Sequence, residues 1–307
     1  MKKYDVVTMG EALIDFVPKE DSISGTYKAT VGGAPFNVAV SVSKLVGKVA
    51  MIARVGRDPL GDYVESALEK AGVDCSFVQH DNEKLTPVTI VLPKTTDMMR
   101  YIIYRNNGSD SVLDFNEIPS ELFSNMHIFH IGILLMASGI SAETTRKAVA
   151  AAKNGNALVS MDVNLRPGVW KSKEEMIEAS WELIPCADII KMTQEEAKEL
   201  NFNPKVEAQK NKIILITDGQ NDAYLYHNDL VIAEPVPQVE VVDVTGAGDS
   251  FMAAFLYAYL VFIKKGNGIT KDQLEKCLKV AVYAGSLTVQ KYGACESYPS
   301  KDQLNLL

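Results

Sequence analysis

The sequence predicts an α/β fold: a doubly wound, mostly parallel sheet with helices on both faces, and a small β-sheet beside it. Strand-like apolar runs alternate with helical patterns along most of the 307 residues, which is the order that βαβ units require. Runs such as 213–216 are continuously apolar, as in strands buried on both sides. Two further pairs of strand-like runs have no helix between them and therefore predict hairpins.

The elements of the main layer are predicted in chain order. The expected strands are 6–9, 50–55, 128–131, 157–161, 189–191 and 213–217. The expected helices are 38–45, 60–71, 142–152, 176–184 and 195–200, and the apolar run 251–263 is expected to be a buried helix. Because a helix follows nearly every strand, neighbouring strands should be parallel.

The two hairpins predict a lid. Runs 12–17 and 27–31 form one pair, and runs 88–92 and 100–104 form the other. We expect these segments, about 12–32 and 86–106, to make a small sheet that projects from the main layer. No repeat or long linker interrupts the sequence, so residues 1–307 are predicted to form a single domain.

Composition excludes several classes of protein. Hydrophobic residues make up 47% and charged residues 23% of the chain, and the net charge is −8 without a basic block, which argues against disorder and against a nucleic-acid partner. The longest apolar run, 251–263, is too short to span a bilayer, and the N-terminus lacks the pattern of a signal peptide. The cysteines form no CxxC pair, which favours reduced thiols in a cytoplasmic protein; they are Cys75, Cys186, Cys277 and Cys295.

The segment 243–249, DVTGAGD, precedes the apolar helix and is the richest in chemistry. Gly246 and Gly248 allow a sharp turn and close approach of a ligand. The amides of residues 246–249 would then lie unpaired at the positive end of a helix, which is a site for a phosphoryl group. A carboxylate at Asp249 could take a proton from a hydroxyl nucleophile. The alternative is that Asp249 only caps the helix.

Two other phosphate-binding motifs are absent. A dinucleotide fingerprint would need a third glycine where Phe251 stands, and a Walker A motif would need Gly-Lys-Ser/Thr, which the chain lacks. After the first strand only Gly10 is found, so a nicotinamide-dependent dehydrogenase is disfavoured. Segment 243–249 is therefore a different phosphate-binding device.

Segment 243–249 resembles the C-terminal signature of the ribokinase-like (PfkB) carbohydrate kinases, and 32–39 (GGAPFNVA) resembles their N-terminal signature. The likeness extends over the whole chain, and the segment 10–15 (GEALID) together with GGAP is most similar to fructokinases. The resemblance implies a lid that closes over a sugar, and transfer of the ATP γ-phosphate to a primary hydroxyl with Mg²⁺ bound to the ATP.

The resemblance also implies roles for single residues. Asp249 would be the catalytic base, and the amides of Gly246, Ala247 and Gly248 would form the anion hole. Residues that would contact the sugar are Asp15, Gly32, Gly33, Asn37, Arg105, Asn164 and Arg166. A carboxylate, bare backbone and amides can together bind a polyol, and an arginine suits phosphate oxygens. The alternatives are an exposed charge for Asp15, a helix cap for Asn37, and a surface ion pair for Arg166.

Nucleotide and cation sites follow from the same resemblance. Thr217, Gly219 and Ala284, with Gly246 and Gly248, would contact ATP, and Glu196 would act on Mg²⁺ through water. Two departures bear on these roles, because Thr193 replaces the usual asparagine of the Asn-x-x-Glu motif and Val282 stands where many relatives have asparagine near the adenine. Ligands for a K⁺ ion would come from Asp243, Thr245, Gly293 and Ser297.

Several alternatives remain open from sequence. The acceptor could be 2-keto-3-deoxygluconate, ribose or a nucleoside instead of fructose, and the chain could be a non-catalytic sugar-binding protein. Two lids could pack into a homodimer. His127 and His130 are three residues apart in a predicted strand, so their side chains should face opposite sides and share no metal.

Overall fold

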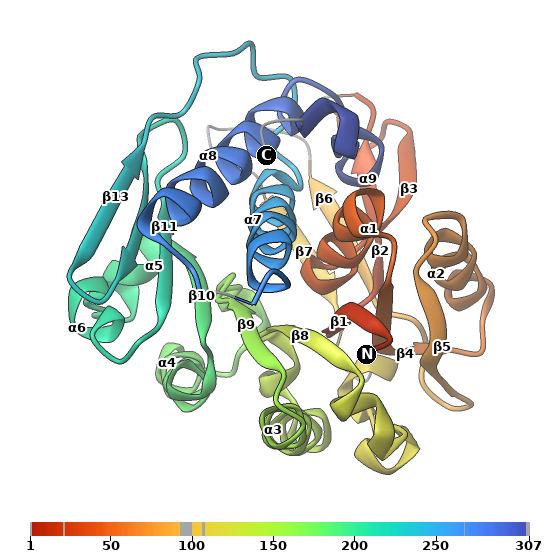
Figure 1. Ribbon diagram of the computed structural model, residues 1–307. Coiled ribbons are helices and arrows are strands. Elements are labelled where there is room, and N and C mark those ends of the chain that lie inside the picture. The colour runs from red at the N-terminus through yellow and green to blue at the C-terminus, as the bar shows by residue number, and fades with distance from the viewer. Residues whose placement is uncertain (1, 21, 93–99, 106–107, 267, 305–307) are drawn as a thin grey trace.

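The computed structural model describes residues 2–20, 22–92, 100–105, 108–266 and 268–304. Its main sheet has nine strands in the order β13-β12-β11-β10-β9-β8-β1-β4-β5 (Figure 1). The strands are β1 (Tyr4–Met9), β4 (Val49–Gly56), β5 (Asp74–Asp81), β8 (Met126–Gly132), β9 (Leu158–Asp162), β10 (Ile189–Thr193), β11 (Ile213–Thr217), β12 (Ala223–His227) and β13 (Leu230–Glu234). The predicted fold class is confirmed.

Strand pairing is parallel from β5 to β11, and β12 and β13 add an antiparallel hairpin at the other edge. The strand β1 lies between β4 and β8. The strand order therefore runs from β1 toward one edge through β4 and toward the other edge through β8. Ligand sites of open α/β sheets form at such a reversal, outside the carboxyl ends of the strands. Strands β5, β12 and β13 were not predicted. β5 and β13 are the two edge strands and β12 lies next to β13, and strands at or near an edge lack the continuous apolar runs of buried ones.

Helices cover both faces of the sheet (Figure 1). One face packs against α1 (Ala34–Val46), α2 (Pro59–Lys70), α7 (Ala247–Ile263) and α8 (Lys271–Thr288), and the other against α3 (Gly139–Asn154), α4 (Lys173–Leu183), α5 (Gln194–Glu199) and α6 (Pro204–Ala208). Phe255 of α7 and Phe129 of β8 are completely buried in the two cores. Burying one such ring contributes about 1.5–3 kcal/mol.

The second sheet has four strands in the order β3-β2-β6-β7. They are β2 (Leu13–Pro18), β3 (Tyr27–Gly32), β6 (Val88–Leu92) and β7 (Arg100–Tyr104). Each predicted hairpin is antiparallel, and the parallel pairing of β2 with β6 joins the two hairpins. The separate sheet is therefore as predicted; residues 21, 93–99 and 106, which belong to the predicted lid segments, lie outside the described residues.

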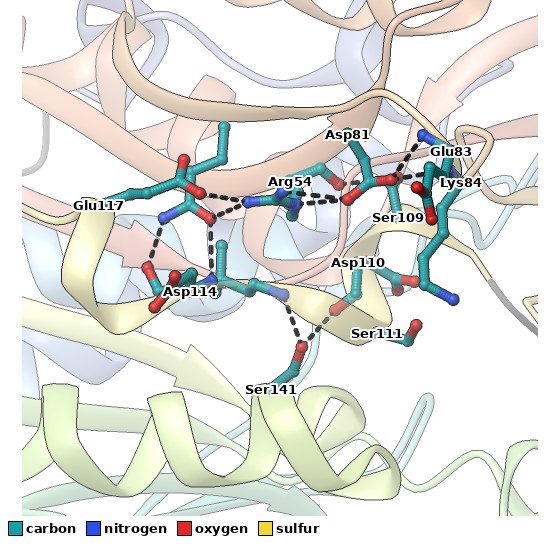
Figure 2. A network of polar contacts seen from close by, with 12 residues as sticks. Arg54, Asp81, Glu83, Lys84, Ser109, Asp110, Ser111, Asp114, Glu117 and Ser141 are labelled. Carbon is teal, nitrogen blue, oxygen red and sulfur yellow. Dashed lines mark hydrogen bonds and ion pairs between the residues drawn. The ribbon is translucent and has the colours of Figure 1, made fainter.

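A polar network attaches the chain that follows the lid to the main sheet. Arg54 at the end of β4 lies between Asp81 and Glu117 and forms ion pairs of 3.0 and 2.8 Å with them (Figure 2). Ser141 of α3 donates to the carbonyl of Asp110 at 2.7 Å. These contacts fix the 3-10 helix Ser109–Val112, which carries the buried Asp110. The network thus sets where the lid returns to the body.

Among the described residues, none of the helices combines the length and the apolar character that a membrane crossing needs. The same part of the chain contains no group of three or more His, Cys, Asp or Glu side chains suited to a metal ion. His130 is buried, and its Nδ1 lies 2.9 Å from the Ser160 hydroxyl.

Candidate active site

The helix α7 begins at a left-handed glycine. Gly246 has φ 77° and is the N-cap residue. The amides of Gly246, Gly248 and Asp249 have no acceptor among the described residues, whereas the Ala247 amide donates to the carbonyl of Val244 at 3.2 Å. The expectation of an unpaired amide at Ala247 is therefore not met, because the tight turn closes a hydrogen bond there. The remaining amides leave an anion site at the helix N-terminus.

Asp249 lies in the first turn of α7, half-buried. Its Oδ2 accepts a 2.8 Å hydrogen bond from Asn37 Nδ2 of α1, and among the described residues its carboxylate accepts no hydrogen bond from a backbone amide of α7. The alternative that Asp249 is only a cap is thus not what the structure shows. Burial raises the pKa of Asp249, and the charges of Lys191 and Arg166 and the Asn37 hydrogen bond oppose that rise. A raised pKa makes a carboxylate a better base.

Asp15 projects from the lid strand β2 toward the same place. Burial raises its pKa to about 6; a hydrogen bond from Thr89 and the charge of Arg166 lower it, and the charge of Asp249 raises it. Asp15, Arg166 and Asp249 are therefore within electrostatic reach of one another, although they come from three distant parts of the chain. Asp15 is not the exposed charge that the alternative proposed.

The two glycines before α1 have no room for a side chain. A Cβ on Gly32 would lie 2.0 Å from Asp15 Oδ2, and a Cβ on Gly33 would lie 2.3 Å from the carbonyl oxygen of Glu11. Gly33 also has φ 109°, a value that side chains rarely permit. The backbone of this turn thus packs directly against the Asp15 carboxylate. Asn37 lies in the first turn of α1 and is 7% exposed. Its side chain donates to Asp249 and does not cap its own helix.

The segment after β9 supplies the next group. Asn164 has φ 44°, and Arg166 donates to the Leu165 carbonyl at 2.9 Å. The Arg166 guanidinium lies 5.8 Å from the centre of the Tyr101 ring, on the lid strand β7. Among the described residues Arg166 has no carboxylate partner within ion-pair distance. Arg166 therefore connects lid and body instead of forming the surface ion pair of the alternative.

Glu196 lies in the first turn of α5 and holds the segment after β9. Its Oε1 accepts from the Leu165 amide at 2.6 Å, and its Oε2 accepts from the Thr193 amide at 2.8 Å. Thr193 Oγ1 in turn accepts from the Glu196 amide at 3.1 Å, which completes a capping box. The threonine that departs from the family motif is thus the cap of α5, and both Glu196 oxygens already accept a backbone hydrogen bond.

Arg105 lies under the lid and not in an open cleft. It is 7% exposed, forms an ion pair with the fully buried Asp110, and donates from Nη1 to the Leu134 carbonyl at 2.7 Å. Only its Nη2 is buried without a partner in the described part of the chain. The structure shows Arg105 committed to the base of the lid, whereas the sequence prediction had it reach the substrate.

The predicted nucleotide contacts lie on separate elements, Thr217 and Gly219 at the end of β11 and Ala284 in α8. Thr217 ends β11, and Gly219 follows in the turn with φ 58°. Beside this turn is a cavity of about 460 Å³; its lining includes Gln194, Asp218 and Tyr224. Ala284 is completely buried in α8, and a Cβ on the neighbouring Gly285 would lie 3.5 Å from the carbonyl oxygen of Ala247 in the glycine turn. A contact of Ala284 with ATP stays a prediction.

Asp243 organises the loop before the glycine turn. Its Oδ1 accepts from the amide and hydroxyl of Thr245 at 3.0 and 2.7 Å, and its Oδ2 accepts from the Gly293 amide at 2.9 Å. Ser297 donates to the Ala294 carbonyl at 2.7 Å. Three of the four predicted K⁺-site residues are thus directly linked, and the Asp243 carboxylate is occupied by donors of the fold.

Sequence reasoning missed two buried charged residues. Lys191 of β10 is 6% exposed and pairs with Asp162 Oδ2 at 2.9 Å. Glu11 follows β1; burial raises its pKa to about 7, and its Oε1 accepts from the Ala34 amide at 3.0 Å. The signal for Lys191 was present, because a lysine inside an otherwise apolar strand is rarely buried without a partner.

The family described as pfkB family carbohydrate kinase matches residues 3–301. Fructokinase-1 of Zea mays is 31% identical, over 97% of this chain and 96% of that protein. The chain therefore belongs to the PfkB carbohydrate kinases and is a sugar kinase.

Solved structures agree with this assignment. The fructokinase of Xylella fastidiosa with bound ATP has a TM-score of 0.89 at 26% identity, and the similarity covers 99% of this chain and 97% of that one. A double mutant of the Vibrio cholerae O395 fructokinase, bound to fructose, ADP and a potassium ion, has a TM-score of 0.87 at 26% identity, covering 99% and 98%.

Proposed function

We propose that this kinase transfers the γ-phosphoryl group of ATP to a primary hydroxyl of fructose, with Asp249 as the catalytic base. One observation carries the proposal: the Asp249 carboxyl group is held by Asn37 at 2.8 Å in the same helical turn as the unpaired amides of Gly248 and Asp249. A base and an anion site are thus adjacent. The fructose assignment is supported by the GEALID and GGAP segments and by the fructokinases among the relatives.

The chemical step follows from this adjacency. The sugar oxygen forms a bond to the γ-phosphorus, the bond from that phosphorus to the β–γ bridging oxygen breaks, and Asp249 takes the hydroxyl proton. Free amides at the N-terminus of α7 stabilise the charge on the transferring group. Because Gly246 and Gly248 carry no side chain, that group can approach the backbone closely.

The sugar lies between lid and body in this proposal. Asp15 accepts hydrogen bonds from sugar hydroxyls, Gly32 and Gly33 expose backbone to the sugar, and Asn37 both holds Asp249 and donates to the sugar. From the other side Asn164 contacts the sugar, and Arg166 binds sugar or phosphate oxygens. Arg105 supports the lid from below.

The nucleotide binds along the carboxyl edge of β10 and β11, with Thr217 and Gly219 beside it. When bound with ATP, Mg²⁺ neutralises phosphate charge; Glu196 would hold it through water, and the buried Asp162 Oδ1, which lacks a described partner, offers a second oxygen. Oxygen donors of this kind suit Mg²⁺. A K⁺ ion would bind carbonyl oxygens near Asp243, Thr245, Gly293 and Ser297, and replacement of K⁺ by Na⁺ should then lower turnover.

A coupled assay of ADP release tests the substrate. Fructose, 2-keto-3-deoxygluconate, ribose and adenosine are compared at equal concentration, and the largest kcat/KM is expected for fructose. A larger value for another acceptor would overturn the fructose assignment but leave the kinase intact. No ADP release with any acceptor, together with measurable sugar binding, would instead support a non-catalytic sugar-binding protein.

Three wider proposals complete the function. We treat residues 1–307 as one catalytic domain whose lid is the four-stranded sheet. A cytoplasmic location is the second of these proposals, and the absence of a CxxC pair among the cysteines supports it. Exposed side chains of the outer lid strand β7, Tyr101, Ile102 and Tyr104, are the surface through which two lids would pair, and sedimentation of the native enzyme measures that association.

A further inference from the structure

A lysine ammonium lies directly beneath the glycine turn of α7. Lys191 Nζ bonds to Asp162 Oδ2 at 2.9 Å, and a Cβ placed on Gly248 would lie only 2.7 Å from that nitrogen. The ammonium therefore packs against the backbone of the residue whose amide belongs to the anion site. A side chain at Gly248 would push the ammonium away.

The hydrogen bonds of Lys191 are incomplete. An ammonium has three protons to donate, and Asp162 is its one hydrogen-bond acceptor among the described residues. Lys212, another buried lysine of the same fold, donates instead to three backbone carbonyls, those of Ile184, Pro185 and Ala187. Two unpartnered protons on a side chain that is 7% exposed are costly unless a ligand accepts them.

Three carboxylates act on Lys191 electrostatically. The carboxylates of Asp162, Glu196 and Asp249 raise the pKa of Lys191 against the effect of burial. His130, which also faces this lysine, is held neutral because burial and the lysine charge lower its pKa to about 3. A lysine that served only as the partner of Asp162 would need only one of its three ammonium protons.

We infer that Lys191 is a further catalytic residue, whose ammonium donates hydrogen bonds to oxygens of the transferring phosphoryl group. This inference rests on the proposed phosphotransfer. Asp162 positions the ammonium beside Gly248, whose free amide belongs to the anion site. Asp249 alone takes the hydroxyl proton, while Lys191 keeps its own protons. Charge-assisted hydrogen bonds of this kind are about twice as strong as neutral ones.

Binding without turnover tests the inference first. In Lys191→Met, calorimetric titration with AMP, ADP and ATP should show AMP affinity within about twofold of wild type and ATP affinity lower by roughly 10- to 100-fold. Lys212→Met is the matched control and should leave all three affinities unchanged. Equal weakening for AMP and ATP would overturn the inference, because the lysine would then shape the whole site and not bind phosphate.

Turnover gives the second test. Lys191→Met should lower kcat by roughly 10²–10³-fold, as for loss of one anion-hole donor. The double variant Asp162→Asn with Lys191→Met removes the uncompensated carboxylate, so it should keep the wild-type melting temperature. In titrations without Mg²⁺, which do not depend on Asp162 as a metal ligand, the double variant should still bind ATP roughly 10- to 100-fold more weakly than the wild type. Recovery of ATP affinity in that double variant would show that Lys191 only neutralises Asp162. Absence of turnover in the wild type would refute the proposed function. The nucleotide titrations would still show whether Lys191 binds the phosphate groups of ATP.

Discussion

Replacement of Asp249 by asparagine isolates proton transfer from binding. The side chain keeps its size, and its oxygen can still accept the 2.8 Å hydrogen bond from Asn37 Nδ2. What is lost is the ability to take a proton. A positioned base supplies roughly 10²–10⁴-fold, so we expect kcat to fall about a thousandfold, which at 1.36 kcal/mol for each factor of ten is about 4 kcal/mol of transition-state stabilisation.

The stability of the folded protein should not fall in the Asp249→Asn variant, although its turnover does. Because burial raises the pKa of Asp249, the charged form is disfavoured in the folded protein, and the ionised carboxylate costs stability at neutral pH. The Asp249→Asn variant should therefore melt no lower than the wild type. A large loss of turnover would then reflect chemistry and not unfolding.

Three measurements decide the outcome: kcat from ADP release, ATP affinity by calorimetry, and the melting temperature. Asp272→Asn is the matched control, because Asp272 occupies the first turn of α8 just as Asp249 occupies that of α7, but is exposed; it should retain wild-type kcat. If Asp249→Asn turned over within about threefold of the wild type, far less than loss of a general base allows, Asp249 would not be the base.

Further changes test the rest of the site. Folding raises the pKa of Asp15 from 3.8 to about 6, so the folded protein favours the neutral carboxyl group. The resulting contribution to the free energy of unfolding is at most about 3 kcal/mol. It is fully present below pH 4 and is lost as the pH rises through about 6. Asp15→Asn should accordingly melt above the wild type at pH 7.5, with the difference vanishing below pH 4; a gap that widens in acid would contradict this. Gly32→Ala would place a Cβ 2.0 Å from Asp15 Oδ2, so KM for the sugar should rise roughly 10- to 100-fold while KM for ATP stays unchanged. A rise in both KM values would show that the substitution distorts the whole active site. Arg105→Met leaves Asp110 buried without its cation and should cost about 3–5 kcal/mol in urea unfolding; a smaller loss when Asp110→Asn is added would identify the uncompensated charge as the cause, and an equal loss would exclude it.

Local patterns in the sequence were enough for most strands and helices of the main sheet, although not for β5, β12 and β13, and for the unpaired amides of Gly246 and Gly248. A continuous apolar run such as 213–216 indicates a buried parallel strand because both of its faces must be covered. The pair Gly246 and Gly248 before an apolar helix indicates free amides because the first turn of a helix has no internal acceptors. Both arguments need only neighbouring residues.

Contacts between distant segments were decided by the tertiary structure alone. Asn37 and Asp249 are 212 positions apart, and only the packing of α1 beside α7 brings them together. The pairing of Lys191 with Asp162 depends on β10 lying next to β9 in register, which no local periodicity specifies. The commitment of Arg105 to Asp110 and the burial of Ala284 likewise depend on what packs around them, because the environment of a side chain is set by the order of strands and helices in space.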